Sequence, residues 1–364
     1  MSDKNKGMPL KKIKLPKDKI RTGPGLFGRL FGLVGLLVIG AALFGFLAAL
    51  KYSLNFLAPE ATSREVVVNI PQGYSNAQTA TLLAEKGVIK SPDAFLLAVR
   101  IRSGLKKPVN IKAGEQITDP SLSVWEVISG LEKGVFKFYP FTIPEGWTMR
   151  DISASVERAG LGPASEFLSL CRDKAFIASL GFETDSLEGY LFPETYSFPK
   201  GTPLRSIVKS MTDHFWRVWE KYDAAASTEG LSMKEVVTLA SIVEKETGSA
   251  GERPMIAAVF FNRLKKKMRL QTDPTVIYGL VNFNGNLTRA DLETKHPYNT
   301  YVIDGLPPGP IANPGEDAIK AVLNPAPGKY LYFVSKNDGT HHFSETLAEH
   351  NRMVNRYQRG GGGS

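Results

Sequence analysis

The sequence contains a single cysteine, Cys171, among its 364 residues. An intramolecular disulfide is therefore excluded, and the folded parts must be held together by packed apolar cores. Histidine is also scarce, and the five histidines show no HExxH or related ligand spacing. We predict no metal site and no cofactor.

An excess of positive charge is found only at the N-terminus. The formal net charge is +9, but residues 1–29 alone hold nine Lys or Arg against two Asp. The rest of the chain is close to neutral, so the high isoelectric point does not indicate a nucleic-acid-binding fold. We predict no nucleic-acid partner.

A charge-free run of 21 residues, Leu30–Leu50, follows this basic segment. As a helix it would cross about 30 Å of hydrocarbon. Basic residues on its N-terminal side are the positive-inside signal. We therefore predict a cytoplasmic tail over 1–29, a single transmembrane helix over 30–50 and an exported remainder. A cleavable signal peptide is the alternative, but its apolar core is normally shorter, and no clear small-x-small site follows Ala49.

A weak internal repeat follows a predicted linker over 51–63. Val68–Tyr74 and the helical stretch after it are echoed 73 residues later by Phe141–Trp147 and its helical stretch. Each copy is typical of a short strand, a Pro-x-Gly turn and an amphipathic helix that stops at a glycine. We predict a small α+β domain, or a pair of related βα units, over 64–161. A single irregular domain with a coincidental repeat is the alternative.

The pattern of the sequence changes after about Ser186. Two capping boxes, Ser232–Glu235 and Ser249–Glu252, predict two consecutive helices joined by a very short turn. A loop-rich region over 271–327 follows, then a strand-like run and a last helix ending near Gln358. Long loops of this kind line sites more often than cores. We predict a second domain over 162–358 and a flexible glycine-rich tail over 359–364.

Two carboxylates, Glu244 and Glu246, close the first of these helices. Residues two apart on a helix point about 200° away from each other, so only one of them can face a given cleft. Both lie at the margin of the apolar face, and periodicity does not choose between them. An exposed Glu-Lys-Glu helix end is the alternative interpretation.

Several segments around this pair resemble a known family. They are Glu188–Tyr196, Ala240–Thr247, Asn262–Leu264, Met268–Gly279, Tyr298–Tyr301, Gly305–Ile311, Asn313–Gly315 and Tyr330–Val334. In this order they closely resemble the motifs of the endolytic murein transglycosylases of the MltG (YceG-like) family. The resemblance covers essentially the whole exported chain and includes the membrane anchor.

The resemblance implies a lyase that cleaves the glycosidic bond between N-acetylmuramic acid and N-acetylglucosamine in nascent peptidoglycan. Such an enzyme leaves 1,6-anhydro ends and limits strand elongation. The resemblance identifies Glu246 as the catalytic glutamate. An ordinary glycosidase needs two carboxylates, whereas here the C6 hydroxyl of the muramic acid ring replaces water. A catalytically silent, membrane-anchored peptidoglycan-binding scaffold is the alternative.

Polar and aromatic side chains in the matched motifs are suited to gripping sugar hydroxyl and N-acetyl groups. The predicted substrate-binding residues are Glu194, Gln271, Asp273, Tyr278, Tyr298, Asn299 and Tyr301. Two S-x-x-K sequences, Ser103–Lys106 and Ser206–Lys209, raise a penicillin-binding type of acyl enzyme as a rival. Neither is joined by an S-D-N or K-T-G element, so we interpret both as chance.

The predicted fold class is therefore α+β. It comprises the single N-terminal transmembrane helix, a small LysM-like α+β domain over 64–161 and a mixed α/β catalytic domain over 162–358, whose long loops line a cleft. The resemblance implies a place in the bacterial inner membrane, with the N-terminus cytoplasmic and the catalytic domain periplasmic. It also implies peptidoglycan glycan strands as substrate and peptidoglycan synthases as candidate partners. Glycan binding by the LysM-like region is a hypothesis, since fold similarity does not confer function.

Overall fold

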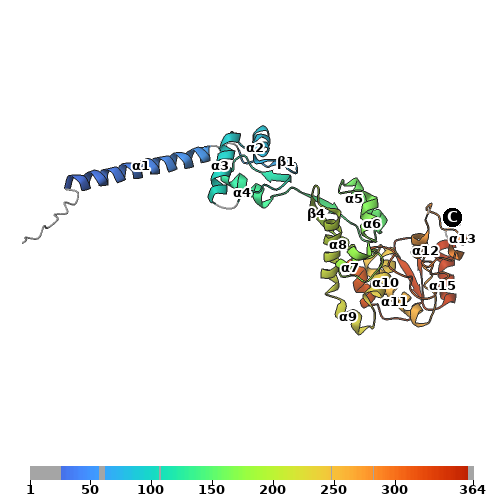
Figure 1. The fold of residues 1–364 in the computed structure, drawn as a ribbon. Helices are drawn as coiled ribbons and strands as arrows, with labels where there is room; N and C mark the ends of the chain where they lie inside the picture. The colour runs from blue at the N-terminus through green and yellow to red at the C-terminus, as the bar shows by residue number, and fades with distance from the viewer. Residues whose placement is uncertain (1–25, 57–61, 106–107, 247, 282, 360–364) are drawn as a thin grey trace, which may run out of the picture. The chain divides into compact units, whose positions relative to one another are not determined.

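The computed structural model describes residues 26–56, 62–105, 108–246, 248–281 and 283–359 (Figure 1). Within the first helix, α1 (Leu26–Phe56), side chains are described for 32–48. Most of the predicted cytoplasmic tail, the glycine-rich residues 360–364 and Thr247 therefore lie outside the described residues.

The chain divides into two compact units. Unit 1 comprises residues 1–68, 73–112 and 118–134, and unit 2 comprises residues 69–72, 113–117 and 135–364. Both contain helices and short strands, which confirms the predicted mixed α+β class. The second copy of the repeat lies in unit 2, although the sequence had grouped it with the first copy in 64–161.

Unit 1 is built mainly of helices around a small sheet. Its helices are α1, α2 (Asn76–Glu85), α3 (Pro92–Leu105) and α4 (Val124–Lys133). The strands β1 (Val66–Ile70) and β2 (Gly114–Thr118) form a two-stranded sheet. Leu83, Phe95 and Ile128 are fully buried and join α2, α3 and α4 in one apolar core. Within the part of the chain that the structure describes, no helix combines the length and the apolar character that a membrane crossing requires.

The two copies of the repeat share their local geometry. In the first, a capping box between Ser75 and Gln78 opens α2, and in the second, a box between Thr148 and Asp151 opens α5. Each helix ends before a glycine of positive φ, +68° at Gly87 and +67° at Gly160, a conformation that glycine adopts without steric cost. The predicted strand, turn and helix are confirmed in both copies.

Unit 2 contains two antiparallel sheets of two strands each and the remaining helices. Its elements are β3 (Phe138–Thr142), α5 (Met149–Arg158), α6 (Ala164–Leu170), α7 (Lys174–Ser179), β4 (Thr195–Pro199), α8 (Leu204–Trp219), α9 (Asp223–Thr228), α10 (Met233–Glu246), η1 (Ala250–Glu252), α11 (Arg253–Lys265), α12 (Asp273–Gly279), α13 (Arg289–Glu293), α14 (Glu316–Leu323), β5 (Tyr332–Ser335), β6 (His341–Ser344), α15 (Leu347–Val354) and η2 (Asn355–Arg359). β3 pairs with β4 and β5 pairs with β6, both antiparallel.

Helix α10 runs through the core of unit 2. Every residue from Val236 to Val243 is buried, and the helix contacts α11, α12 and α14. The predicted Ser232–Glu235 capping box is confirmed, because Glu235 Oε2 accepts from the Ser232 backbone N–H at 2.9 Å and Ser232 Oγ accepts in return. A helix buried on all sides cannot shift easily, so it fixes the position of its last residues.

The aromatic side chains of α8 pack inward. Trp216 stacks on Phe182 with 4.8 Å between ring centroids, and Trp219 stacks on Phe215 at 6.3 Å. The indole Nε1 of Trp216 donates to the Leu180 carbonyl at 3.0 Å. Both tryptophans thus belong to the aromatic packing of unit 2. Cys171 is completely buried in the same apolar cluster.

Candidate active site

The two glutamates at the end of α10 have different surroundings. Glu244 is nearly buried, and its Oε1 lies 2.7 Å from Nη2 of Arg253. Its Oε2 accepts a hydrogen bond of 3.1 Å from the Gly315 backbone N–H. Glu244 is thus committed to a buried ion pair that ties α10 to α11 and to the loop before α14. These contacts occupy both carboxylate oxygens of Glu244.

Glu246 lines a cleft of about 560 Å³ in unit 2. The walls come from the end of α10, from α11 and α12, from β5 and β6, and from α15. The side chain is half-buried rather than directed into open solvent. It reaches this place because α10 ends there, with its apolar length packed in the core.

The environment of Glu246 favours its protonated form. Burial is the largest cause and raises the pKa of Glu246 to about 7. The Thr272 hydroxyl donates to Glu246 Oε1 and opposes this rise, whereas the nearby Asp273 carboxylate adds to it. His341 and Arg263 lower the pKa by smaller amounts. A carboxyl with a pKa near neutrality can both give and take a proton at physiological pH.

Three predicted binding residues line the same cleft: Gln271, Asp273 and Tyr301. The Tyr301 hydroxyl donates to Asp273 Oδ1 at 2.6 Å, and burial raises the pKa of Tyr301 above its ordinary value. Gln271 adopts a φ of +49°, which costs a non-glycine residue about 1–2 kcal/mol. Its backbone N–H donates to the Thr300 carbonyl at 3.1 Å, a bond that helps to hold the strained residue at the cleft.

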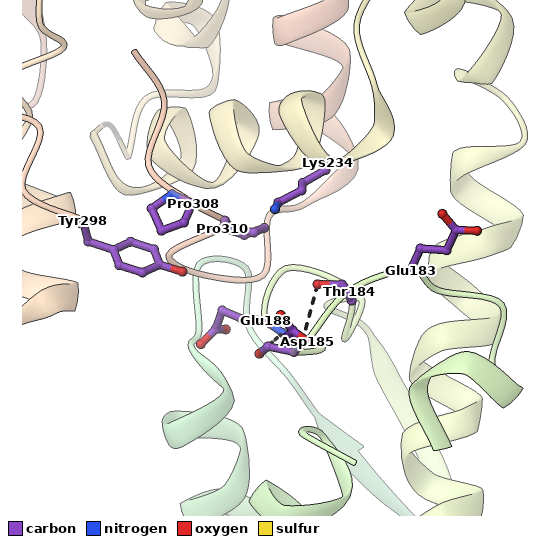
Figure 2. A pocket seen from close by; sticks show the side chains of 10 residues that line it. Glu183, Thr184, Asp185, Glu188, Lys234, Tyr298, Pro308 and Pro310 are labelled. Atoms are coloured by element: carbon purple, nitrogen blue, oxygen red, sulfur yellow. Dashed lines mark hydrogen bonds between the residues drawn. The ribbon is translucent and has the colours of Figure 1, made fainter. Parts of the chain in front are cut away.

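Two further predicted residues, Tyr278 and Tyr298, belong to a separate group around Glu188. Their rings lie 4.8 Å apart, and the Tyr278 hydroxyl donates to Glu188 Oε2 at 3.1 Å. Burial raises the pKa of Glu188 to about 7. Tyr298 and Glu188 line a pocket of about 380 Å³ together with Lys234, and Figure 2 shows the Tyr298 hydroxyl directed into it. Neither tyrosine lines the Glu246 cleft.

The last two predicted residues have other environments. Glu194 is exposed next to β4 and accepts from the backbone N–H of Thr195 at 2.8 Å. Asn299 is buried, and its Nδ2 donates to the carbonyls of Asp291, Leu292 and Thr294. The structure thus brings neither side chain into the Glu246 cleft.

Arg263 lines the cleft although the sequence analysis assigned it no role. Its Nε donates to the Leu331 carbonyl at 2.7 Å, and its Nη1 donates to the Leu270 carbonyl at 2.8 Å. Arg263 therefore joins the loop after α11 to the segment before β5. Its position in the Asn262–Leu264 motif was the available signal.

The predicted Ser249–Glu252 capping box is wrong. Ser249 makes no side-chain cap, and the Glu252 carboxylate instead accepts from the backbone N–H of His341 at 2.9 Å and contacts the His341 ring at 2.7 Å. His341 is a second cleft residue that sequence reasoning missed. Its partner is 89 residues away in the chain, so local spacing held no signal for the contact.

The fold and the site define a mixed α+β protein in which a cleft carboxyl, that of Glu246, is suited to acid–base chemistry. The chain belongs to the YceG-like family, whose sequence model matches residues 68–356. Among the described residues, no three His, Cys, Asp or Glu side chains are grouped so that they could hold a metal ion.

Named relatives and a solved structure support this membership. The chain is 34% identical over 327 residues to the endolytic murein transglycosylase of Bacillus subtilis strain 168, covering 85% of this chain and 90% of that protein. It is 30% identical to the protein of that name from Streptococcus pneumoniae strain D39, covering 84% of this chain and 61% of the relative. A crystal structure of a putative yceG-like protein from Listeria monocytogenes superposes with a TM-score of 0.55 at 34% identity, over 80% of this chain and 100% of that one.

Proposed function

We propose that this chain is an endolytic lytic transglycosylase. It cleaves the bond between N-acetylmuramic acid and N-acetylglucosamine in nascent peptidoglycan and leaves 1,6-anhydro ends that limit strand length. The observation that carries the proposal is Glu246, a half-buried carboxyl with a pKa raised to about 7 in a cleft. The names of the relatives support the same reaction class.

In the proposed reaction, Glu246 protonates the bridging oxygen as its bond to C1 of the muramic acid ring breaks. The C6 hydroxyl of the same ring forms the new bond to C1 and loses its proton, which ultimately returns to the Glu246 carboxylate. Water is not consumed, so the reaction is a lyase reaction. A carboxyl that is largely neutral near pH 7 is suited to the first step.

Gln271, Asp273 and Tyr301 are the proposed contacts to the sugar. They line the cleft with Glu246 and present an amide, a carboxylate and a phenol edge. Few polar groups usually fix a ligand in a site of this size. Tyr278, Tyr298, Glu194 and Asn299 are not part of this proposal, because they lie outside the cleft.

The test is product analysis of purified glycan strands with the wild type and with Glu246→Gln. We expect 1,6-anhydro products from the wild type and at least about a hundredfold less from the variant. Glu229→Gln, an exposed glutamate at the end of α9, is the matched control and should leave the rate unchanged. Unaltered product formation by Glu246→Gln would remove the catalytic assignment, whereas a wild type that binds strands without cutting them would favour a silent scaffold.

Residues 30–50 are the proposed membrane anchor, with residues 1–29 cytoplasmic and the catalytic unit periplasmic in the inner membrane. The charge-free run and the basic residues before it support this assignment. All described side chains of α1, 32–48, are exposed, including Leu36 and Phe44 at 73% and 75%. Exposure of this apolar surface to water is unfavourable, and lipid would cover it.

Cell fractionation tests the anchor. The full chain should sediment with membranes and resist extraction by salt, and a chain without residues 1–50 should not. External protease should digest the catalytic unit in spheroplasts and spare an epitope placed in residues 1–29. A soluble full chain would contradict the anchor but not the reaction. Because the anchor would hold the enzyme near newly made strands, peptidoglycan synthases are its proposed neighbours.

The LysM-like region over 64–161 is proposed to contribute glycan contacts. Its two βα copies share a capping box and a helix that ends at a glycine of positive φ. The resemblance to LysM suggests the ligand. Hydrogen exchange of the Glu246→Gln chain with and without glycan strands tests the idea. Protection within 64–161 is expected, and protection confined to the Glu246 cleft would contradict it.

A further inference from the structure

The Glu252–His341 pair has the geometry of a carboxylate–imidazole dyad. His341 Nδ1 lies 2.7 Å from Glu252 Oε2, and the His341 backbone N–H donates to Glu252 Oε1 at 2.9 Å. The two side chains are 13% and 11% exposed. Attachment at both the ring and the backbone fixes the orientation of the imidazole.

His341 lines the same cleft as Glu246. A carboxylate beside Nδ1 favours the tautomer in which Nδ1 carries the hydrogen. In the neutral ring, Nε2 then carries a lone pair that can accept a proton. Phe333 and Phe343 pack near the ring, with centroids at 5.5 and 6.4 Å, and keep its surroundings apolar.

The neighbouring histidine provides a contrast within the same strand. His342 lies 3.4 Å from Glu349 through Nε2, at a partly exposed position. It does not line the cleft. The close, shielded carboxylate contact is thus found at the histidine that shares a cavity with Glu246.

We propose that His341, oriented by Glu252, is a second catalytic residue of the cleft and accepts the proton of the attacking hydroxyl. This inference rests on the proposed function. Glu246 gives its proton to the bridging oxygen, the bond from C1 to that oxygen breaks, and the bond from C1 to O6 forms. The C6 hydroxyl proton passes to His341 Nε2, which leaves an imidazolium and a Glu246 carboxylate. Transfer of that proton to Glu246 restores both groups.

The charged and titratable groups around His341 favour this cycle. Glu252 from η1 stabilises the imidazolium, and Glu246 at the end of α10 is the final proton acceptor. Arg263 from α11 places a positive charge in the same cleft. Asp273 from α12 and His350 from α15 also face the cleft.

The test compares His341→Asn with the matched control His342→Asn in the full chain. Asparagine can retain a donor toward Glu252 but cannot titrate. For His341→Asn, we expect a loss of about 10²- to 10⁴-fold in kcat with little change in KM. The shape of the pH–rate profile should also change, because asparagine cannot accept a proton. The control should keep the wild-type rate and profile.

A second variant, Glu252→Gln, keeps an acceptor beside the ring and removes its charge. It should lower kcat by a smaller factor than His341→Asn, with little change in KM. Retained kcat and an unchanged pH–rate profile in folded His341→Asn would overturn the inference, as would an increase in KM alone. If His341→Asn fails to fold, a wild-type kcat in Glu252→Gln overturns it. Failure of the proposed function is distinguishable, because the wild type would then form no anhydro ends.

Discussion

Glu244 Oε1 lies 2.7 Å from Arg253 Nη2, and this ion pair separates the roles of the two glutamates in one motif. Glu244 holds α10 against α11, whereas Glu246, two residues later, reaches a cleft. The buried pair therefore stabilises the end of the helix from which the candidate acid projects.

Glu244→Gln should lower stability more than chemistry. A buried Arg253 that loses its partner is costly, by about 3 kcal/mol, although Glu145 Oε2 at 3.4 Å offers partial compensation. Urea denaturation measures the loss, with Glu229→Gln as control. A folded Glu244→Gln chain that has wild-type stability and makes no anhydro product would contradict this division of roles.

Thr272→Val should move the alkaline limb of the pH–rate profile upward. Activity requires protonated Glu246, so it should fall as pH rises through about 7 in the wild type. The Thr272 hydroxyl lowers the pKa of Glu246, and removing this hydrogen bond should raise that pKa further. A series of kcat/KM measurements against pH gives the answer, and a limb that stays in place or moves down would exclude the predicted influence.

The stability of Glu188→Gln relative to the wild type should increase as pH rises. The pKa of Glu188 is raised from 4.5 to about 7 on folding. The native state therefore binds more protons than the unfolded state between these values, and the wild type loses stability across that window. Glutamine can keep partners at Met149, Asn313 and Tyr278. Denaturation at pH 5 and pH 8 should show a larger advantage for the variant at pH 8; an equal difference at both pH values would speak against the raised pKa.

Tyr301→Phe should weaken substrate binding. The change removes the hydroxyl that donates to Asp273 Oδ1 at 2.6 Å while the ring remains. We expect KM to rise by about tenfold, which corresponds to about 1.4 kcal/mol, because Asp273 loses its orientation in the cleft. Steady-state kinetics on glycan strands measure the change, with Tyr298→Phe as control. Equal effects of the two substitutions would argue against a special role for Tyr301.

Asn299→Ala should destabilise the loop before the cleft. The variant leaves three backbone carbonyls without their side-chain donor and the Tyr301 backbone N–H without its acceptor. At about 1 kcal/mol for each bond, the loss should be about 2–4 kcal/mol. Thermal unfolding measures it. A stable variant with only a raised KM would restore Asn299 to the binding site predicted from its motif.

Elements governed by local sequence were predictable. The Ser232–Glu235 capping box and the apolar positions of α10 depend only on residues a few positions apart. The structure contains the helix that they predict, Met233–Glu246. The strand, turn and helix of each repeat were recognisable for the same reason, since Gly87 and Gly160 mark conformations that few other residues adopt.

Contacts between distant segments were not predictable from spacing. Helical periodicity did not distinguish Glu244 from Glu246, and only the structure places Arg253 and Gly315 beside the former. Glu252 resembles a capping residue, but its carboxylate bonds His341 on another element. Asn299 resembles a ligand-binding amide, and three backbone carbonyls take its donors. In each case a tertiary partner competed with the local or functional role that the residue type suggests.

The lone thiol of Cys171 gives the protein a built-in reporter. Its side chain is completely buried, and burial raises its pKa above the ordinary value for cysteine, so the reactive thiolate is rare in the native state. A maleimide should therefore modify each molecule once at most, and only while the surrounding core is open. The labelling rate would report how often the core around Cys171 opens. No other thiol in the chain would contribute to the signal.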